Sequence, residues 1–181
     1  PGTAAEVLDD EVRAVICPDK LSTAQWLSVM RDAHEIGFRT TATLMYGHVE
    51  TPRQVARHFL RLRELQRQTG GFTEFVPLSF VHSEAPMHRK GLVKGIQPGA
   101  TGAEVIRMHA IARIMLHGHI PNSQCCWVKE GTKLAQVLLA AGCSDVGGTL
   151  INESISTAAG ANHGQLVPPS ALRRFIRDAG R

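Results

Sequence analysis

The stretch RTTATLMYGHVETPRQVARHFLRLREL (39–65) contains the pattern that decides the fold. Its first part, Arg39–Met45, is rich in threonine and aliphatic residues and has the length of a strand. Thr51-Pro52-Arg53-Gln54 then forms a capping box with proline at the first helical position, and apolar residues follow at helical spacing. Gly70-Gly71 ends this helix, and another strand-like stretch, Phe72–Phe80, follows. This order of strand, helix and strand predicts a parallel crossover.

The same alternation continues on both sides of this unit. The other expected elements are strands at Ser123–Val128 and Ser144–Leu150, and helices that begin at Ser22, Thr101, about Thr132 and Pro169. About four consecutive parallel βα units predict an α/β fold, as an open doubly wound sheet or as part of a barrel. Because the glycine-rich phosphate fingerprint follows none of the strands, the doubly wound alternative is weaker. A complete barrel needs about 250 residues and eight units. We therefore interpret residues 1–181 as one half of a (β/α) barrel.

Composition and charge exclude several classes of protein. The chain is 43% hydrophobic and 20% charged with a net charge of +4, which is typical of a globular domain and not of a disordered one. We expect no membrane contact, because no stretch approaches the roughly 20 apolar residues of a bilayer span. The basic cluster Arg53–Arg67 has helical spacing and is interpreted as a solvated helix face, so we expect no nucleic acid partner. The chain begins without methionine and without a signal peptide, so we expect a piece of a larger protein.

The cysteines predict neither a disulfide framework nor a zinc site. Cys17, Cys125, Cys126 and Cys143 form no CxxC pair, so we expect no metal ligands in this chain. A reducing compartment is the simpler location, and we expect the cytoplasm, with a eukaryotic organelle left open. A Ser-His-Asp elbow and a Walker pattern are both missing from the sequence.

Polar and small residues follow the strand ends, where α/β folds place their ligand sites. The first strand is followed by Tyr46–Glu50 and the second by His82–Glu84; Gln124 and Trp127 lie in the third, and the fourth with its following loop contributes Gly147–Ser154. Each has a structural alternative: the glutamine could satisfy backbone groups, the tryptophan could be core, and the glycines could allow close packing. Together, on one face, they predict a binding site.

The segment TATLMYGHVET (41–51) resembles the GxIxGxxE motif of radical S-adenosylmethionine enzymes. Thr43, Met45, Gly47 and Glu50 occupy its four fixed positions, with threonine for the first glycine and methionine for the isoleucine. The resemblance implies that the backbone at this strand end binds the adenine of the cofactor and that the glycine permits its close approach.

Longer segments narrow the resemblance and together cover nearly the whole chain. The segments PGTAAEVLDDEVR (1–13), CPDK (17–20), TGGFTEFVPLSFVHSEAP (69–86) and VGGTLINESISTAAGANHG (146–164) resemble the second subunit or domain of FO synthase. That family of 4-hydroxyphenyl transferases makes a deazaflavin precursor with S-adenosylmethionine and a 4Fe–4S cluster. The resemblance implies the C-terminal part of a radical barrel. It also implies that a deoxyadenosyl radical abstracts hydrogen from L-tyrosine, and that the 4-hydroxybenzyl unit adds to 5-amino-6-(D-ribitylamino)uracil.

Site residues carry over from the resemblance where they match. Glu6 would contact the ribose or amino group of the cofactor, Lys20 its carboxylate, and Met45 and Gly47 its adenine. The substrate face would contain Gln124, Trp127, Gly148, Thr149 and Asn152. A second radical domain or subunit that closes the deazaflavin ring is implied as a partner.

One departure limits what this chain does alone. The CxxxCxxC loop that holds the cluster in this superfamily is missing from the sequence. We therefore expect the cluster ligands in an N-terminal half outside this chain, and we expect this piece alone to be inactive. Two alternatives stay open: a radical enzyme of the menaquinone (futalosine) pathway on the same fold, and a non-catalytic half-barrel fragment.

Overall fold

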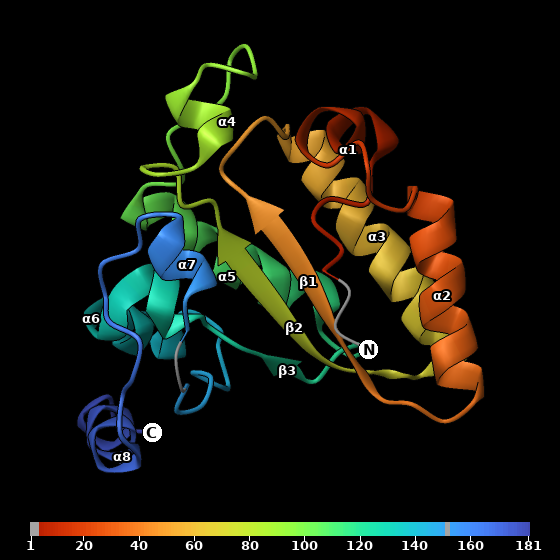
Figure 1. Cartoon of the computed structure of the whole chain (residues 1–181). Coiled ribbons are helices and arrows are strands. Elements are labelled where there is room, and N and C mark those ends of the chain that lie inside the picture. The colour runs from red at the N-terminus through yellow and green to blue at the C-terminus, as the bar shows by residue number, and fades with distance from the viewer. Residues whose placement is uncertain (1–3, 151–152) are drawn as a thin grey trace.

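The computed structural model describes residues 4–150 and 153–181. Helices and strands alternate along most of the chain, as the sequence predicts (Figure 1). Their order is α1 (Asp10–Ile16), α2 (Thr23–Glu35), β1 (Thr40–Tyr46), α3 (Pro52–Thr69), β2 (Phe72–Ser79), α4 (Pro86–Arg89), α5 (Gly102–Leu116), β3 (Asn122–Ser123), α6 (Trp127–Ala140), α7 (Ile155–Ala158) and α8 (Pro169–Asp178).

The three strands form one parallel sheet in the order β1-β2-β3. β1 and β2 pair from Thr40↔Phe72 to Tyr46↔Ser79, with one irregularity between Thr40 and Thr41. The short β3 adds Phe75↔Ser123 at the far edge of β2. Sequential strands that are neighbours and parallel confirm the predicted crossovers.

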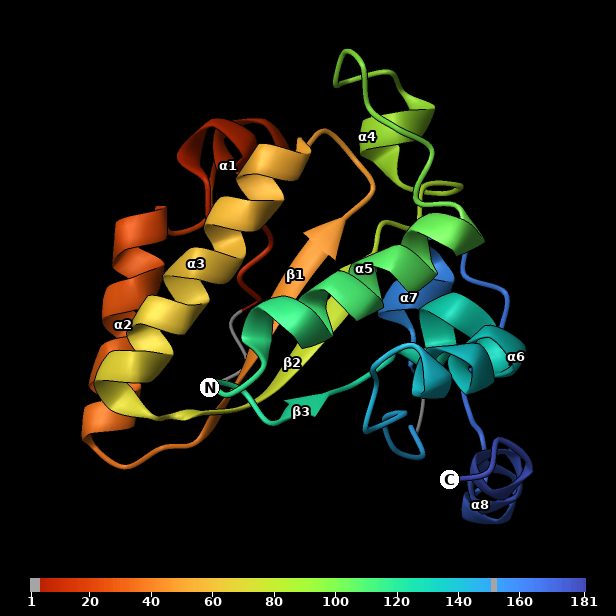
Figure 2. The same ribbon diagram turned by 180° about the vertical axis from the view of Figure 1, so that it is seen from behind.

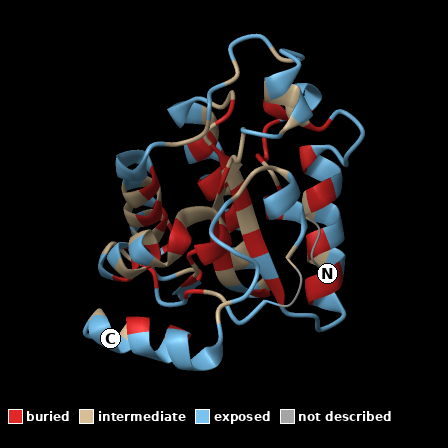
Figure 3. Ribbon diagram, turned by 60° about the vertical axis from the view of Figure 1, so that its left-hand side comes forward, coloured by how far each residue is buried: buried red, intermediate tan, exposed pale blue. Residues whose placement is uncertain are grey.

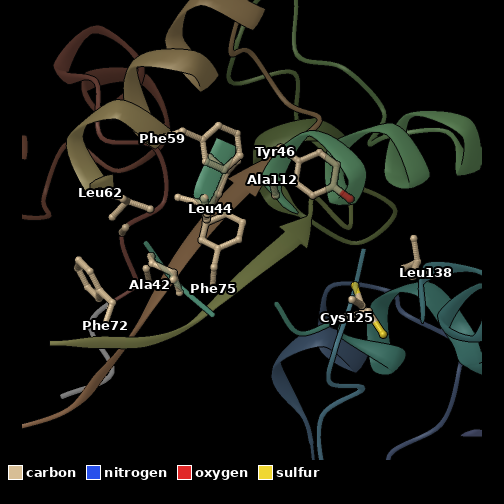
Figure 4. Packing of buried hydrophobic residues seen from close by; sticks show 14 of the residues in the cluster. Ala42, Leu44, Tyr46, Phe59, Leu62, Phe72, Phe75, Ala112, Cys125 and Leu138 are labelled. Carbon is tan, nitrogen blue, oxygen red and sulfur yellow. The ribbon is translucent and has the colours of Figure 1, made fainter. Parts of the chain in front are cut away.

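One face of the sheet is covered by helices. Ala42, Leu44 and Tyr46 alternate along β1 and are buried, and α3 and α5 lie across this face (Figure 2). Figure 4 shows Leu44 together with Phe59 of α3 and Phe75 of β2, whose ring centroids are 5.4 Å apart. Burial of these apolar side chains is the main stabilising term for this layer.

The opposite face of the sheet is open in this chain. Thr43 and Met45 point to this side and are only half-buried, so burial alternates along β1 (Figure 3). Figure 1 shows this face toward the viewer, with α3 and α5 on the far side of the sheet and α2 at the right. Since the inner face of a barrel sheet is covered by the rest of the barrel, this openness agrees with the interpretation as a partial barrel.

The three predicted capping boxes are all present. In each, a threonine or serine hydroxyl accepts the N–H of the residue three positions later: Ser22 from Gln25, Thr51 from Gln54, and Thr101 from Glu104. These reciprocal bonds fix the starts of α2, α3 and α5. The two later helices are also present: α8 begins at Pro169, but α6 begins at Trp127, earlier than the expected Thr132, and bends at Gly131 (φ 77°). The short helices α1, α4 and α7 were not anticipated.

The third predicted strand, Ser123–Val128, is wrong in length. Only Asn122–Ser123 pairs as a strand, and Trp127 begins α6 instead of lying in a strand. The N–H groups of Lys129 and Glu130 both donate to the carbonyl of Cys126 at 3.1 Å, which closes a helical turn here. Local helical bonding thus ends the strand early.

The predicted strand at Ser144–Leu150 is reduced to one bridge, Gln124↔Asp145. The Asp145 carboxylate accepts the N–H of Gly147 at 2.5 Å, and Gly147 has a φ of 69°. An Asx turn with a left-handed glycine cannot continue an extended strand. The structure therefore confirms a parallel α/β fold of the predicted kind but not the count of four units.

None of the described helices is both long and apolar enough to span a membrane.

Candidate functional site

An irregular segment, Ala5–Asp9, runs beside β1 on the edge away from β2; we call it the strap. Its Glu6 carbonyl accepts the N–H of Met45 at 2.9 Å. The N–H of Ala5 donates to the hydroxyl of Thr43, also at 2.9 Å. Glu6 was expected at the end of a preceding strand; the strap is not a regular strand, but its Glu6 lies beside Met45 in the carboxyl half of β1.

Glu6 forms an ion pair with Lys20. The Nζ–Oε1 distance is 2.5 Å, and the side chains are 13% and 46% exposed for Glu6 and Lys20. Three of the four predicted cofactor residues, Glu6, Lys20 and Met45, are therefore brought together. A carboxylate beside an ammonium group offers an acceptor for hydroxyl or amine donors and a cation for a carboxylate.

The turn after β1 is closed by Glu50. Its two carboxylate oxygens accept the N–H groups of Gly47 at 2.5 Å and of His48 at 2.9 Å. Gly47 has a φ of 87°, and a Cβ there would lie 2.8 Å from the backbone nitrogen of Ala100. The chain itself therefore requires glycine at this position, independently of any ligand.

His48 is part of the same turn and fully buried. Its Nδ1 accepts the N–H of Val49 at 2.7 Å, and its Nε2 lies 3.1 Å from the carbonyl of Met45. Burial lowers the pKa of this imidazole, although the nearby Glu50 carboxylate acts in the opposite direction. Both ring nitrogens have partners within the turn, so His48 has a structural role here.

At the β3 edge of the sheet, the predicted substrate residues Gln124, Trp127 and Gly148 also meet. The Trp127 indole N–H donates to the Gly148 carbonyl at 3.1 Å. A Cβ on the neighbouring Gly147 would lie 3.3 Å from the Gln124 amide oxygen and 3.8 Å from the Trp127 ring. The small residues of this loop thus let it pack against Gln124 and Trp127.

The two remaining predicted substrate residues do not join this group in the same way. The Thr149 hydroxyl donates to the carbonyl of Val167 at 2.9 Å, so this exposed residue is tied to the segment before α8. Asn152 lies outside the described residues.

Glu74 is a site residue that the sequence analysis missed. Its carboxylate accepts the amide N–H of Gln124 at 3.0 Å. Burial, and secondly the nearby Asp145 carboxylate, raise its pKa. Glu74 is two residues before Val76 in the strand. Because side chains alternate between the two faces of a strand, this spacing could have placed Glu74 on the same face of β2 as Val76.

The register shows how far apart the two groups are. Ser123 pairs with Phe75, so Gln124 is level with Val76, which pairs with Thr43 of β1. Two strand spacings separate Gln124 from Thr43, or about 10 Å. Thr43 and Gln124 therefore lie on the same open face at a distance that a small molecule can bridge, with the cofactor residues at the β1 edge and the substrate residues at the β3 edge.

The loops beyond the strands meet at this end as well. The Glu84 N–H, in the loop after β2, donates to the carbonyl of Ala159 at 2.9 Å. This bond joins α7 to the β2 loop (Figure 1). Segments 75 residues apart in sequence thus converge at the carboxyl end of the sheet.

A cleft of about 780 Å³ lies elsewhere, between α3 and α5. Val55 and Phe59 of α3 and Met108 and Met115 of α5 line it, and Gly47 is the one predicted cofactor or substrate residue there. This cleft is on the helix side of the sheet (Figure 2). It is therefore separate from the open face where the predicted residues gather.

The thiols of this chain do not form a cluster site. All four cysteines are free, and three of them are buried. In residues 4–150 and 153–181, three or more metal-ligating side chains nowhere come together. An iron–sulfur cluster, which is held by a set of thiolates, does not fit the residues described.

Comparison with known proteins supports the family resemblance that the sequence motifs indicate. Residues 69–181 match the family model described as "CofH/MqnC C-terminal region". Relatives from Methanothermobacter thermautotrophicus, Methanopyrus kandleri and Methanocaldococcus jannaschii are 54%, 52% and 48% identical to this chain. Each is named 5-amino-6-(D-ribitylamino)uracil--L-tyrosine 4-hydroxyphenyl transferase. The matches cover 99–100% of this chain and 48–49% of the relatives, so the chain spans about half the length of the curated relatives it matches.

Proposed function

Because this chain belongs to the CofH/MqnC C-terminal family, we propose that the whole protein transfers the 4-hydroxybenzyl group of L-tyrosine to 5-amino-6-(D-ribitylamino)uracil. The observation that carries the proposal is 48–54% identity, along essentially the full chain, to relatives named for this transfer. The arrangement of Glu6, Lys20 and Met45 beside the open face supports it.

In this proposal residues 1–181 are the C-terminal half of a radical barrel. The rest of the protein covers the open face and supplies the thiolates for a 4Fe–4S cluster, since the described residues do not fit one. We place the reaction in the cytoplasm, and a ring-closing radical domain or subunit acts on its product.

The strap edge of the sheet would hold S-adenosylmethionine, which, with an electron from the reduced 4Fe–4S cluster, supplies hydrogen-abstracting radical chemistry. The Glu6 carboxylate would accept from the ribose or amino group, and Lys20 would bind the carboxylate after leaving its ion pair. The Met45 backbone N–H already donates to Glu6. Met45 would therefore contact the adenine through its half-buried side chain. Ala100 fills the space beside Gly47, so Gly47 would contact adenine through its carbonyl group.

The β3 side would hold the substrates. The Gln124 amide and Glu74 carboxylate supply hydrogen-bonding groups on the open face, and Thr149 and Asn152 would extend it. Trp127 is only 1% exposed. Its contribution is therefore to hold the Gly148 carbonyl in place rather than to touch a substrate directly. A closed, dry cavity would protect radical chemistry from water.

The alternative within the same family is a menaquinone-pathway radical enzyme. The matched family description joins two names, so it does not choose between substrates. The names of the three relatives favour the tyrosine transfer.

The test is a product assay with the full-length protein, reconstituted anaerobically with iron, sulfide, S-adenosylmethionine and a reductant. With L-tyrosine and the ribityl uracil, we expect mass spectrometry to find the 4-hydroxybenzyl adduct and 5′-deoxyadenosine. 5′-Deoxyadenosine without the adduct would overturn the substrate assignment and favour the menaquinone alternative. Neither product from a protein with a loaded cluster would favour a non-catalytic role.

A further inference from the structure

A buried arginine holds the strap from the α1 side. Arg13 is 4% exposed, and its guanidinium donates to three backbone carbonyls. Nη1 lies 2.5 Å from the Ala5 oxygen and 3.2 Å from the Val7 oxygen, and Nε lies 2.7 Å from the Leu21 oxygen. The two strap carbonyls flank Glu6, so this one side chain fixes the backbone on both sides of it.

Helix α3 holds the same strap from the other side. The N–H of Leu8 donates to Nδ1 of the buried His58 at 3.0 Å, and Arg61 donates to the Leu8 carbonyl. Arg57 pairs with Asp9 at 3.2 Å. An imidazole accepts at Nδ1 only when that nitrogen carries no proton, so His58 serves as a neutral acceptor. Part of the arginine stripe that looked like a solvated face is thus an anchor for the strap.

The strap holds Glu6 in a strained conformation. Glu6 has a φ of 51°, and within the described part of the chain it alone combines a positive φ with a side chain. Glycine would adopt this conformation without the steric cost. The ion pair with Lys20 is partly exposed and contributes little to stability. The backbone strain at Glu6 lowers stability, and the ion pair of its side chain does not offset that loss. This indicates a role for the Glu6 carboxylate beyond folding.

We infer that Arg13 and His58 are positioning residues, which hold the Glu6 carboxylate at the open face for the methionine-derived cofactor. Both side chains are buried and bond the strap backbone, so they act through it, and the Glu6 carbonyl in turn fixes Met45. This inference rests on the proposed function, because the ligand is the cofactor of that reaction.

The experiment compares two arginines in the full-length, cluster-loaded protein. Arg13→Lys keeps the charge but cannot span three carbonyls. Arg113→Lys is the matched control, because Arg113 also bonds two carbonyls, those of Gly142 and Pro121, at the β3 edge. The readouts are the equilibrium Kd for S-adenosylmethionine, the KM for L-tyrosine, and hydrogen exchange of the strap amides.

For Arg13→Lys we expect the Kd for S-adenosylmethionine to rise about tenfold, with a tyrosine KM within about twofold of wild type. Strap amides should exchange faster, and Arg113→Lys should leave the cofactor Kd unchanged. A folded Arg13→Lys protein that binds the cofactor like wild type would overturn the inference, as would equal losses in both variants. Failure of the proposed function is read separately, as absence of the adduct from the wild type.

A second variant covers the case in which Arg13→Lys does not fold. Glu6→Gly removes both the carboxylate and the backbone strain. We expect it to be at least as stable as wild type and to bind S-adenosylmethionine at least tenfold more weakly. If Glu6→Gly keeps wild-type affinity, the carboxylate has no role in binding and the inference fails.

Discussion

The two edges of the sheet carry irregular segments that are built in opposite ways. At the β1 edge, the strap has Ala5, Val7 and Leu8 fully buried and is held by charged side chains from two helices. At the β3 edge, the segment Cys143–Leu150 ends in exposed residues. Its side-chain anchors there include Arg113 and the Trp127 indole.

This difference indicates a division of labour. The strap is fixed before any ligand arrives, which suits a cofactor that must be held in one orientation in every turnover. The β3 edge is rich in glycine and only lightly held, so it can adjust to substrates and to the rest of the barrel. We expect the strap to be rigid and the β3 loop to be mobile in solution.

The largest expected difference in stability between the two edges is between variants of Arg13 and of Arg113. Arg13→Ala leaves three carbonyls without their donor in a buried place. We expect it to lower the free energy of unfolding of the full-length protein by about 4 kcal/mol. Arg113→Ala loses bonds that are largely exposed to water, and we expect a loss of about 1 kcal/mol. Urea unfolding followed by tryptophan fluorescence measures both.

Equal losses from Arg13→Ala and Arg113→Ala would remove the contrast between the edges. Arg107→Ala, on the same helix as Arg113, is a control that should change stability by less than about 0.5 kcal/mol.

The sequence predicted the regular part of the molecule well, because its signals are local. Capping boxes at Ser22, Thr51 and Thr101 and β-rich runs before and after α3 depend on neighbouring residues only. The strand at the β3 edge failed for the opposite reason. Its length depends on competition between β pairing and the helical turn at Trp127, and the residue pattern alone does not show that the helical bonds to the Cys126 carbonyl win.

The sequence predicts which residues of the candidate site lie near one another better than it predicts their contacts. Glu6, Lys20 and Met45 meet, and so do Gln124, Trp127 and Gly148, but the resemblance that named them could not show which contacts they already make. Contacts between Arg13 or Arg61 and strap carbonyls leave no pattern in a sequence, because a carbonyl acceptor belongs to every residue type. Their role becomes visible only from coordinates.

Gly47, after β1, and Gly148, at the β3 edge, should differ in how well they tolerate a side chain. Gly47→Ala would place a Cβ 2.8 Å from the Ala100 nitrogen at a φ of 87°. We expect a loss of about 3 kcal/mol, from strain and crowding together. A Cβ at Gly148 meets no atom within 4 Å, and its φ lies outside the left-handed region. We expect Gly148→Ala to change stability by less than about 0.5 kcal/mol.

The same pair separates folding from binding. If the β3 loop faces the substrates, Gly148→Ala should raise the KM of a substrate while its urea midpoint stays at the wild-type value. A Gly47→Ala protein as stable as wild type would contradict the close packing of Ala100 on the turn.

Acid should weaken the strap edge selectively. Burial lowers the pKa of His58 to about 3, against about 6.5 in an unfolded chain. Below pH 6.5 His58 binds a proton in the unfolded state but not in the folded state. The free energy of unfolding therefore falls as the pH falls toward 3. From pH 7 to pH 5 this one group costs about 2 kcal/mol. His34 and His48, whose pKa values burial also lowers, add to the loss.

His58→Asn isolates the contribution of that group, because the asparagine oxygen can accept the Leu8 N–H without titrating. At the β3 edge, burial alone would lower the pKa of His109, but the nearby Cys143 thiol, the Val105 carbonyl and the Glu130 carboxylate together outweigh burial and raise it. A raised pKa gives stability below pH 6.5 that is lost as the pH rises, so acid should not loosen this edge. Hydrogen exchange at pH 5 and pH 7, corrected for intrinsic rates, should therefore show faster opening of strap amides than of amides near Cys143. In His58→Asn the difference between the two pH values should shrink by about 2 kcal/mol, and an unchanged difference would mean that another group titrates at the strap.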